Sequence, residues 1–315
     1  MISLPDFKEK QILFIITEDV DINKIKFFND NICFVKNNKI ENQISFYKIF
    51  AIFIVGDCSL TTVFIKNCKK YGISIFLMNK NFLTYCGLSA VAEGNYLVRS
   101  KQYMFDNQRK LIYSKKLIHN KIENQIFLLE NINSAKINIL KQLQFKIEDV
   151  NNFKELLGIE GVASKNFFKE YFYELDWYRR LPRAKIDPIN LLMDIGYTFL
   201  FNFVDGIICL YGLDTYIGFY HKLFFQRKSL TCDLIEPFRC IIDKQILKSY
   251  HLHQIDYKDF KKEKGSYFLY NKERDKYLEI FSEAIMDKKE EIFCYVRDYY
   301  YSLMNDSEFP IFKIN

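Results

Sequence analysis

Short apolar runs with polar boundaries dominate the first 90 residues of the chain. These runs are rich in β-branched and aromatic side chains, and such runs are typical of strands. They cover residues 11–16, 31–35, 50–55, 73–78 and 82–87. Between them, residues 59–71 have helical spacing, with Ser59 as the expected cap and Gly72 as the expected end. The pattern predicts a β-rich unit with one helix against its sheet.

Helical periodicity replaces the strand pattern at residues 90–95, where we place a domain boundary. The most apolar helix is expected at residues 188–211, with Asp187 as its N-cap and Pro188 at its first position. This helix is apolar almost all round, so we expect it to be the central buried helix of its domain. Later amphipathic helices are expected at residues 257–264, 271–285 and 288–304.

These elements predict an α+β fold. A small N-terminal β-rich domain, residues 1–92, is expected to precede a larger all-α domain, residues 93–315. For the β-rich domain we prefer the role of a scaffold or dimerisation unit. The tail, residues 305–315, is a candidate for a mobile terminus.

Length and composition fit an ordinary globular protein, since 49% of the 315 residues are hydrophobic. The net charge of +6 is mild for a nucleic-acid-binding protein, although it permits a local basic groove. The eight cysteines form no C-x-x-C pair, which argues against a zinc ribbon and fits reduced thiols in a cytoplasmic protein. We see no apolar stretch approaching the length of a membrane span and no signal peptide.

Candidate chemistry centres on residues 212–243, which hold one of only four histidines, His221. Asp233 and Glu236 follow at a spacing of three, so on a helix they would share a face. Both lie in an apolar pattern, where carboxylates are costly without a partner. A histidine nitrogen with carboxylate oxygens suits a divalent cation. A satisfied core histidine beside a capping or salt-bridging acid is the commoner explanation of such a pair.

Two further sequence segments favour a metal site over this commoner explanation. In the segment GIEGVASKNFF, Glu160 lies between Gly158 and Gly161, which we expect to let the backbone turn tightly at the start of a helix. The alternative is an acid that the helix dipole favours at a helix start. The second block is IDPINLLMDIGYTFLFNF, the start of the long apolar helix.

In this order, the blocks resemble those of the CRISPR-associated integrase family, the first Cas protein. That family has a glutamate in a G-x-E-G turn, a D-P-x-N-x-L-L helix start, a G-x-x-H element and a D-L-x-E-x-F-R helix. Here these are Glu160, residues 187–192, His221 and residues 233–239. The resemblance also extends to IVGDCSLTTVFIKNCKKYGISIFLM and NYLVRSKQY, and so covers nearly the whole chain.

The resemblance implies a metal-dependent DNA integrase and endonuclease that inserts protospacer DNA into a CRISPR array. The attacking group would be the 3′-hydroxyl of the protospacer, so neither a protein nucleophile nor an ATP site is required. It also implies a homodimer, with its β-rich domains paired, that works with a dimer of the second Cas protein.

The predicted metal ligands, which are also the predicted catalytic residues, are Glu160, His221 and Glu236. Asp233 is predicted to orient a ligand or to serve as an alternate ligand. Two carboxylates and one imidazole suit Mn²⁺ at least as well as Mg²⁺. We suggest that Pro237 kinks the chain and helps to aim Glu236, although a helix restarting there for packing reasons would look the same.

Basic residues near these positions are candidate contacts to DNA phosphates. A charged surface turn would explain the group at residues 179–185 equally well, and Arg239 could instead hold a ligand carboxylate. The candidates are Arg179, Arg180, Arg183, Arg227, Lys228 and Arg239.

Two other functions remain open at this stage. One is a stand-alone metal nuclease acting on branched repair intermediates, and the other is a DNA-binding scaffold without catalysis. The sequence does not identify the CRISPR subtype or the repeat.

Overall fold

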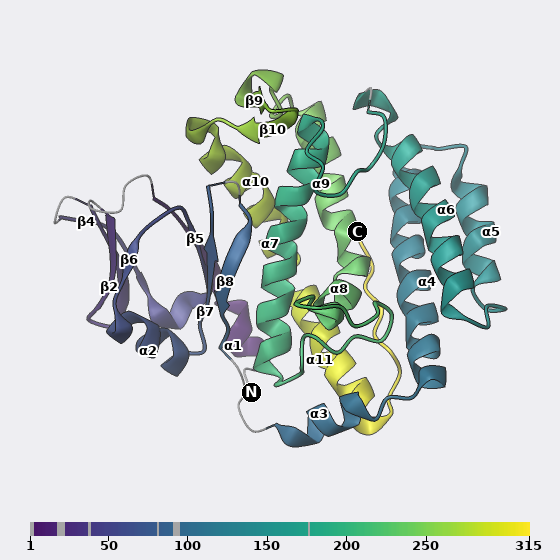
Figure 1. Cartoon of the computed structure of the whole chain (residues 1–315), viewed down its shortest axis with the longest axis horizontal. Coiled ribbons are helices and arrows are strands. Elements are labelled where there is room, and N and C mark those ends of the chain that lie inside the picture. Colours follow the sequence, from purple (N-terminus) through teal and green to yellow (C-terminus); the bar gives the residue numbers. More distant parts are fainter. Residues whose placement is uncertain (1–2, 18–22, 37–38, 81, 91–94, 176) are drawn as a thin grey trace.

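The computed structural model describes residues 3–17, 23–36, 39–80, 82–90, 95–175 and 177–315. It confirms the predicted α+β class, because strands near the N-terminus are followed by a largely helical part (Figure 1). The predicted boundary at residues 92 and 93 falls outside the described residues and stays a prediction.

Two four-stranded sheets form the N-terminal part. In the first sheet three parallel strands are followed by one antiparallel strand, in the order β1 (Gln11–Ile16), β5 (Ile49–Val55), β7 (Ser74–Met78) and β8 (Thr84–Leu88). The order in the second sheet is β4 (Lys39–Ser45), β3 (Asn31–Lys36), β2 (Asn23–Phe28) and β6 (Ser59–Leu60). Strands β2 and β4 were not predicted, since polar residues interrupt their apolar pattern.

Burial explains why the first sheet was the easier one to predict. All seven residues of β5 are buried, as expected for a parallel strand that is covered on both faces. Helix α2 (Thr62–Lys70) lies against the sheets, but its cap is Thr61, whose hydroxyl accepts a 3.1 Å hydrogen bond from the Phe64 amide. The predicted cap, Ser59, lies in β6 instead.

The remaining structure is mainly helical and begins with α1 at the N-terminus. Its α-helices are α1 (Leu4–Lys8), α3 (Tyr96–Tyr103), α4 (Asn107–Asn131), α5 (Ile137–Lys146), α6 (Phe153–Tyr171), α7 (Pro188–Leu210), α8 (Ser229–Leu234), α9 (Arg239–His251), α10 (Arg274–Met286) and α11 (Lys289–Asn305). Short 3-10 turns are η1 (Phe46–Lys48), η2 (Tyr173–Leu175), η3 (Glu236–Phe238), η4 (Tyr257–Asp259) and η5 (Asn271–Glu273).

Helix α7 is the central element of the molecule, between the first sheet on one side and α4, α8 and α9 on the other (Figure 1). The Asp187 carboxylate accepts the Asn190 amide at 2.7 Å, which confirms the predicted cap. The Phe199 ring lies 5.1 Å from Phe14, and the Phe203 ring lies 5.4 Å from Phe50. The sheet and the helices therefore share one apolar core.

The same helix corrects an expectation about membrane spans. By length and composition α7 could cross a membrane, since an 18-residue window has a mean hydropathy of 1.4. However, 83% of that window is buried inside the fold, as in the core helix of a globular protein.

Two C-terminal predictions were wrong. Residues 257–264 form a 3-10 turn followed by β9 (Phe260–Glu263), which pairs with β10 (Ser266–Leu269) in an antiparallel hairpin. The tail is not loose, because three of its apolar side chains are at most 4% exposed. Asn120 and Asn124 of α4 hold its backbone through hydrogen bonds that include one from the Phe312 amide at 2.9 Å. The buried tail side chains are Phe309, Phe312 and Ile314.

Candidate active site

A buried lysine joins two of the predicted ligands. Lys121 Nζ of α4 lies 2.5 Å from Glu160 Oε1 and 2.7 Å from Glu236 Oε2. The three side chains are only 11%, 16% and 4% exposed, respectively. Two acids that are 76 residues apart in sequence therefore meet at one cationic position.

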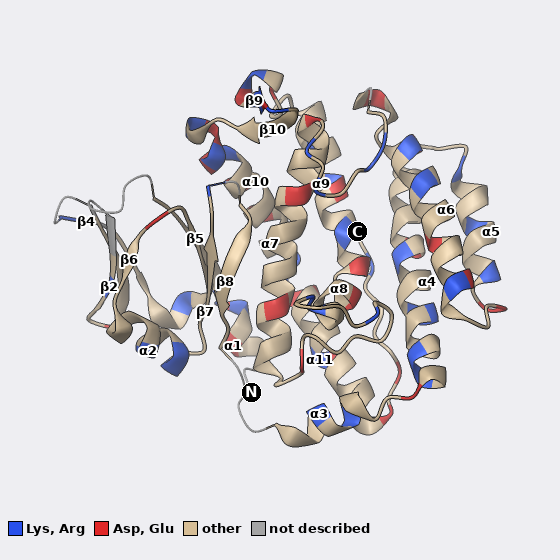
Figure 2. Ribbon diagram, in the orientation of Figure 1, with Lys and Arg blue, Asp and Glu red and all other residues tan. Residues whose placement is uncertain are grey.

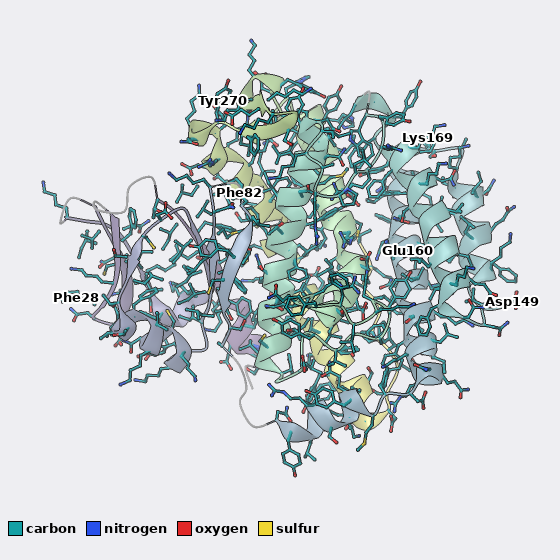
Figure 3. All side chains as sticks on the ribbon, in the orientation of Figure 1. Phe28, Phe82, Asp149, Glu160, Lys169 and Tyr270 are labelled. Carbon is teal, nitrogen blue, oxygen red and sulfur yellow. The ribbon has the colours of Figure 1, made fainter. Side chains whose placement is uncertain are left out.

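Glu160 reaches this position from the interior of a helix. Helix α6 begins at Phe153, seven residues before Glu160, so the predicted tight turn and helix start at Glu160 were wrong. A Cβ added to Gly158 or Gly161 would meet nothing within 4 Å, so no close packing requires either glycine. Figure 3 shows Glu160 on the side of α6 that faces the middle of the molecule.

Glu236 lies in the 3-10 turn η3, which interrupts the helical segment between α8 and α9. Pro237 follows it and prevents a continuous helix at this point. This break was predicted, and it places Glu236 beside α4, where the Asn124 amide group also donates to the Pro237 carbonyl at 3.3 Å. Arg239 Nε lies 3.1 Å from the second oxygen of Glu236, Oε1.

Asp233 holds the loop that carries His221. Its two carboxylate oxygens accept hydrogen bonds from the amides of Phe219, Tyr220 and His221 at 2.7, 3.1 and 2.8 Å. One of these oxygens also lies 2.7 Å from His221 Nδ1. Metal-binding histidines commonly use one ring nitrogen in this way and leave the other for the ion. Of the two roles predicted for Asp233, the geometry favours orienting His221.

Electrostatic coupling links these groups. Burial acts to raise the pKa of Glu236, but the charges of Arg239, Lys121 and His221 lower it to about 2. Burial acts to lower the pKa of His221, yet the Asp233 hydrogen bond and the charges of Asp233, Glu236 and Glu160 raise it above its ordinary value. The acidic groups of the site are therefore held beside cationic side chains that stabilise their charged forms.

The donor set fits a divalent cation once Lys121 moves. Within the described ranges, no three His, Cys, Asp or Glu side chains are already grouped as metal ligands. Lys121 occupies the position between the two glutamates instead. In the described structure Glu236 Oε2 is buried and is paired with Lys121 Nζ, 2.7 Å away. Such an oxygen is a suitable ligand for Mg²⁺ or Mn²⁺.

Sequence reasoning missed two residues at this site. Lys121 lies among the buried apolar residues Leu117, Ile118 and Ile122 of α4, and a lysine inside such a stripe was the available signal. Tyr220 donates its hydroxyl to Glu160 Oε2 at 2.5 Å. No sequence pattern marked this tyrosine among the 22 in the chain.

The predicted DNA contacts occupy different environments. Three of the six already have acidic partners: Arg180 with Asp194 at 2.5 Å, Lys228 with Asp205 at 2.7 Å, and Arg239 with Glu236. Arg227 donates to the Lys222 carbonyl and lies over the Phe224 ring. Arg179 and Arg183 are exposed. All six remain predictions as DNA contacts.

Asn190 fixes the basic segment at residues 179–185 to the start of α7. Its side-chain oxygen accepts the Leu181 amide at 2.8 Å and Arg180 Nη1 at 3.0 Å. Its side-chain nitrogen donates to the Arg179 carbonyl at 3.0 Å. The segment is therefore anchored to the N-terminal end of α7. Figure 2 shows further basic residues along α4, α5 and α6.

Comparison with known proteins identifies the family of this chain. Residues 15–283 match the family described as CRISPR associated protein Cas1. A CRISPR-associated endonuclease Cas1 from Thermodesulfovibrio yellowstonii is 29% identical over 297 residues, covering 88% of this chain and 92% of the relative. A second, from Saccharolobus solfataricus, is 29% identical over 228 residues, covering 66% of this chain and 64% of the relative.

Solved structures share the fold. A Cas1 protein from Thermotoga maritima has a TM-score of 0.84 at 18% identity, covering 96% of this chain and 100% of that chain. A casposase bound to its integration product has a TM-score of 0.81 at 20% identity, covering 95% and 92% of the two chains. A Cas6-RT-Cas1–Cas2 complex scores 0.80 at 21% identity and covers 98% of this chain and 36% of that one. With the family match spanning most of its length, this chain belongs to the CRISPR-associated protein Cas1 family.

Proposed function

We propose that this protein is a metal-dependent DNA integrase and endonuclease of CRISPR adaptation. It would join the 3′-hydroxyl of a protospacer to a phosphodiester at the edge of a CRISPR repeat. The observation that carries the proposal is the meeting of Glu160 and Glu236 at one cationic position, electrostatically coupled to His221. The names of the relatives as CRISPR-associated endonucleases support the reaction class.

Glu160, Glu236 and His221 would hold Mg²⁺ or Mn²⁺. When bound, such an ion polarises a phosphodiester and stabilises the leaving oxygen. Because His221 Nδ1 is paired with Asp233, Nε2 is the ring nitrogen that would bind the ion. Tyr220 and Arg239 each fix one oxygen of a glutamate, so both carboxylates are positioned before substrate arrives. The nucleophile belongs to the DNA, so the chain needs none of its own.

Partners follow from the same proposal. We propose that the protein acts as a homodimer on protospacer and repeat DNA together with a dimer of the second Cas protein. Two structures that share the fold support the DNA and Cas2 partners, since one is a Cas6-RT-Cas1–Cas2 complex and the other is a casposase bound to its integration product. The candidate basic contacts would make DNA binding weaken as the salt concentration rises.

A strand-transfer assay tests the function. The wild-type protein, with a Cas2 partner, is mixed with a repeat-bearing plasmid, Mn²⁺ and a short duplex that ends in a 3′-hydroxyl or a 3′-dideoxy nucleotide. We expect joined product only with the hydroxyl. Glu160→Gln, His221→Ala and Glu236→Gln should each lower joining at least about 100-fold, because each removes a ligand from one ion. Glu155→Gln, an exposed change on the same helix, is the control.

The outcomes separate the alternatives. Cleavage without joined product in the presence of the partner would favour a stand-alone nuclease. DNA binding that survives all three ligand changes, with neither joining nor cleavage by the wild type, would favour a non-catalytic scaffold.

A further inference from the structure

In both Glu160 and Glu236, the two carboxylate oxygens contact different partners. One oxygen of Glu160 accepts the Tyr220 hydroxyl at 2.5 Å, and one oxygen of Glu236 lies 3.1 Å from Arg239 Nε. The remaining two oxygens both face Lys121 Nζ, at 2.5 and 2.7 Å. The oxygens held by Lys121 are therefore the pair that a shared cation would need.

The charges of this group already balance. Glu160 and Glu236 contribute two negative charges, while Lys121 and Arg239 contribute two positive charges, in a region where Glu236 is 4% exposed. A divalent cation added to this group would leave two uncompensated positive charges away from water, which is unfavourable. It would also need the two oxygens that Lys121 occupies.

We propose that Lys121 is a built-in counter-ion of the acidic pair, which a divalent cation must displace from Glu160 and Glu236 in order to bind. This inference rests on the proposed function, since it assumes that the two glutamates are metal ligands. It assigns Lys121 a positioning role: the lysine holds the carboxylates together without metal and weakens metal binding by competition. A lysine that only stabilises the fold would not affect metal affinity in this direction.

The test measures Mn²⁺ binding by calorimetry and by the rise in thermal unfolding temperature with Mn²⁺ concentration. The proteins are the wild type, Lys121→Met and Lys121→Gln. Lys141→Met is the matched control, because Lys141 pairs with Glu130 at 2.8 Å on the exposed surface. Glu160→Gln shows whether the binding measured belongs to this site.

We expect both Lys121 variants to bind Mn²⁺ at least about tenfold more tightly than the wild type, because the competing charge is gone. Mn²⁺ should also raise their unfolding temperature more than it raises that of the wild type, whereas Lys141→Met should behave like the wild type. A Lys121 variant that unfolds without metal should refold with Mn²⁺, because the ion replaces the missing charge.

Three results would overturn the inference. Equal or weaker Mn²⁺ binding by the Lys121 variants, with Glu160-dependent binding by the wild type, would make Lys121 purely structural and leave the proposed function standing. Variants unfolded both with and without Mn²⁺ would show that the ion does not replace Lys121. If no folded protein binds Mn²⁺ in a Glu160-dependent way, the proposed function fails together with the inference.

Discussion

Gly218 shows how closely the residues around His221 are packed. A Cβ added at this position would lie 2.5 Å from Asp233 Oδ2 and 2.9 Å from the Ser229 carbonyl carbon. Neither atom can move freely, because that carboxylate oxygen also accepts the amides of Phe219 and Tyr220. The glycine of the G-x-x-H element is therefore required for the approach of Asp233.

Changing Gly218 to Ala should disturb the support of His221. We expect a loss of about 1–3 kcal/mol in the free energy of unfolding from overpacking, together with reduced strand transfer. Gly158→Ala, on a face of α6 with open space, should instead stabilise by about 0.5–1 kcal/mol. Denaturant unfolding and the joining assay measure both effects. Wild-type stability and activity in the Gly218 variant would contradict this account.

Asp243 makes the stability of the protein depend on pH. Burial raises its pKa to about 7, although Tyr197 donates a 2.5 Å hydrogen bond to it and the charges of Arg239, Arg180 and Lys121 oppose the rise. An unfolded Asp titrates near pH 4. Its stabilising contribution is therefore present below that pH and is lost as the pH rises through about 7.

Replacing Asp243 by Asn should remove this contribution. Between pH 5 and pH 8 the wild type should lose on the order of 1–3 kcal/mol of unfolding free energy relative to Asp243→Asn. Because His221 titrates in both proteins, the difference between the two isolates Asp243. Urea unfolding across this pH range provides the measurement, and parallel curves would show that Asp243 stays ionised throughout.

At the scale of elements, the C-terminal tail supports the turn that carries Glu236. The Phe312 ring packs 4.8 Å from Phe238, at the end of η3. Asn124 of α4 donates both to the Phe312 carbonyl at 3.0 Å and to the Pro237 carbonyl at 3.3 Å. The tail, α4 and η3 therefore form one packed unit behind the site.

Shortening Phe312 to Ala should cost about 3–5 kcal/mol of unfolding free energy, because a large buried ring is lost. We also expect weaker strand transfer, since η3 loses its support. Ile311→Ala is the control in the same tail: its side chain is 64% exposed, and the change should stay within about 0.5 kcal/mol. Similar unfolding curves for the two variants would contradict the packed position of the tail.

Elements with strong local signals were predictable from the sequence. The cap at Asp187 and the break at Pro237 depend on neighbouring residues, so both were placed correctly. Residues 257–264 have the spacing of an amphipathic helix, and only the pairing with β10 makes residues 260–263 a strand. The burial of the tail depends on α4, nearly 200 residues away in sequence, and no local pattern records such a contact.

At the scale of the whole molecule, the site is assembled from four separate parts of the chain. Lys121 comes from α4, Glu160 from α6, His221 from the loop before α8, and Glu236 from η3. The two glutamates could be proposed from sequence because their motifs resemble a family. The role of Lys121 could not, because it appears only when α4 packs against α6 and η3.

The shared core makes this assembly depend on the β-rich part as well. Phe50 and Phe53 of β5 pack against α7. Through Asp205, α7 in turn holds Thr231 of α8 at 2.9 Å. The framework of the site therefore extends across the molecule, from the first sheet to the bundle of α4, α5 and α6 (Figure 1).

Manganese anomalous scattering shows whether Glu160, His221 and Glu236 bind one divalent ion. Crystals of the wild-type protein grown with Mn²⁺ should give one strong peak within coordination distance of both carboxylates and the imidazole. A peak elsewhere, or none at saturating Mn²⁺ in crystals of a protein that still joins DNA, would contradict the account.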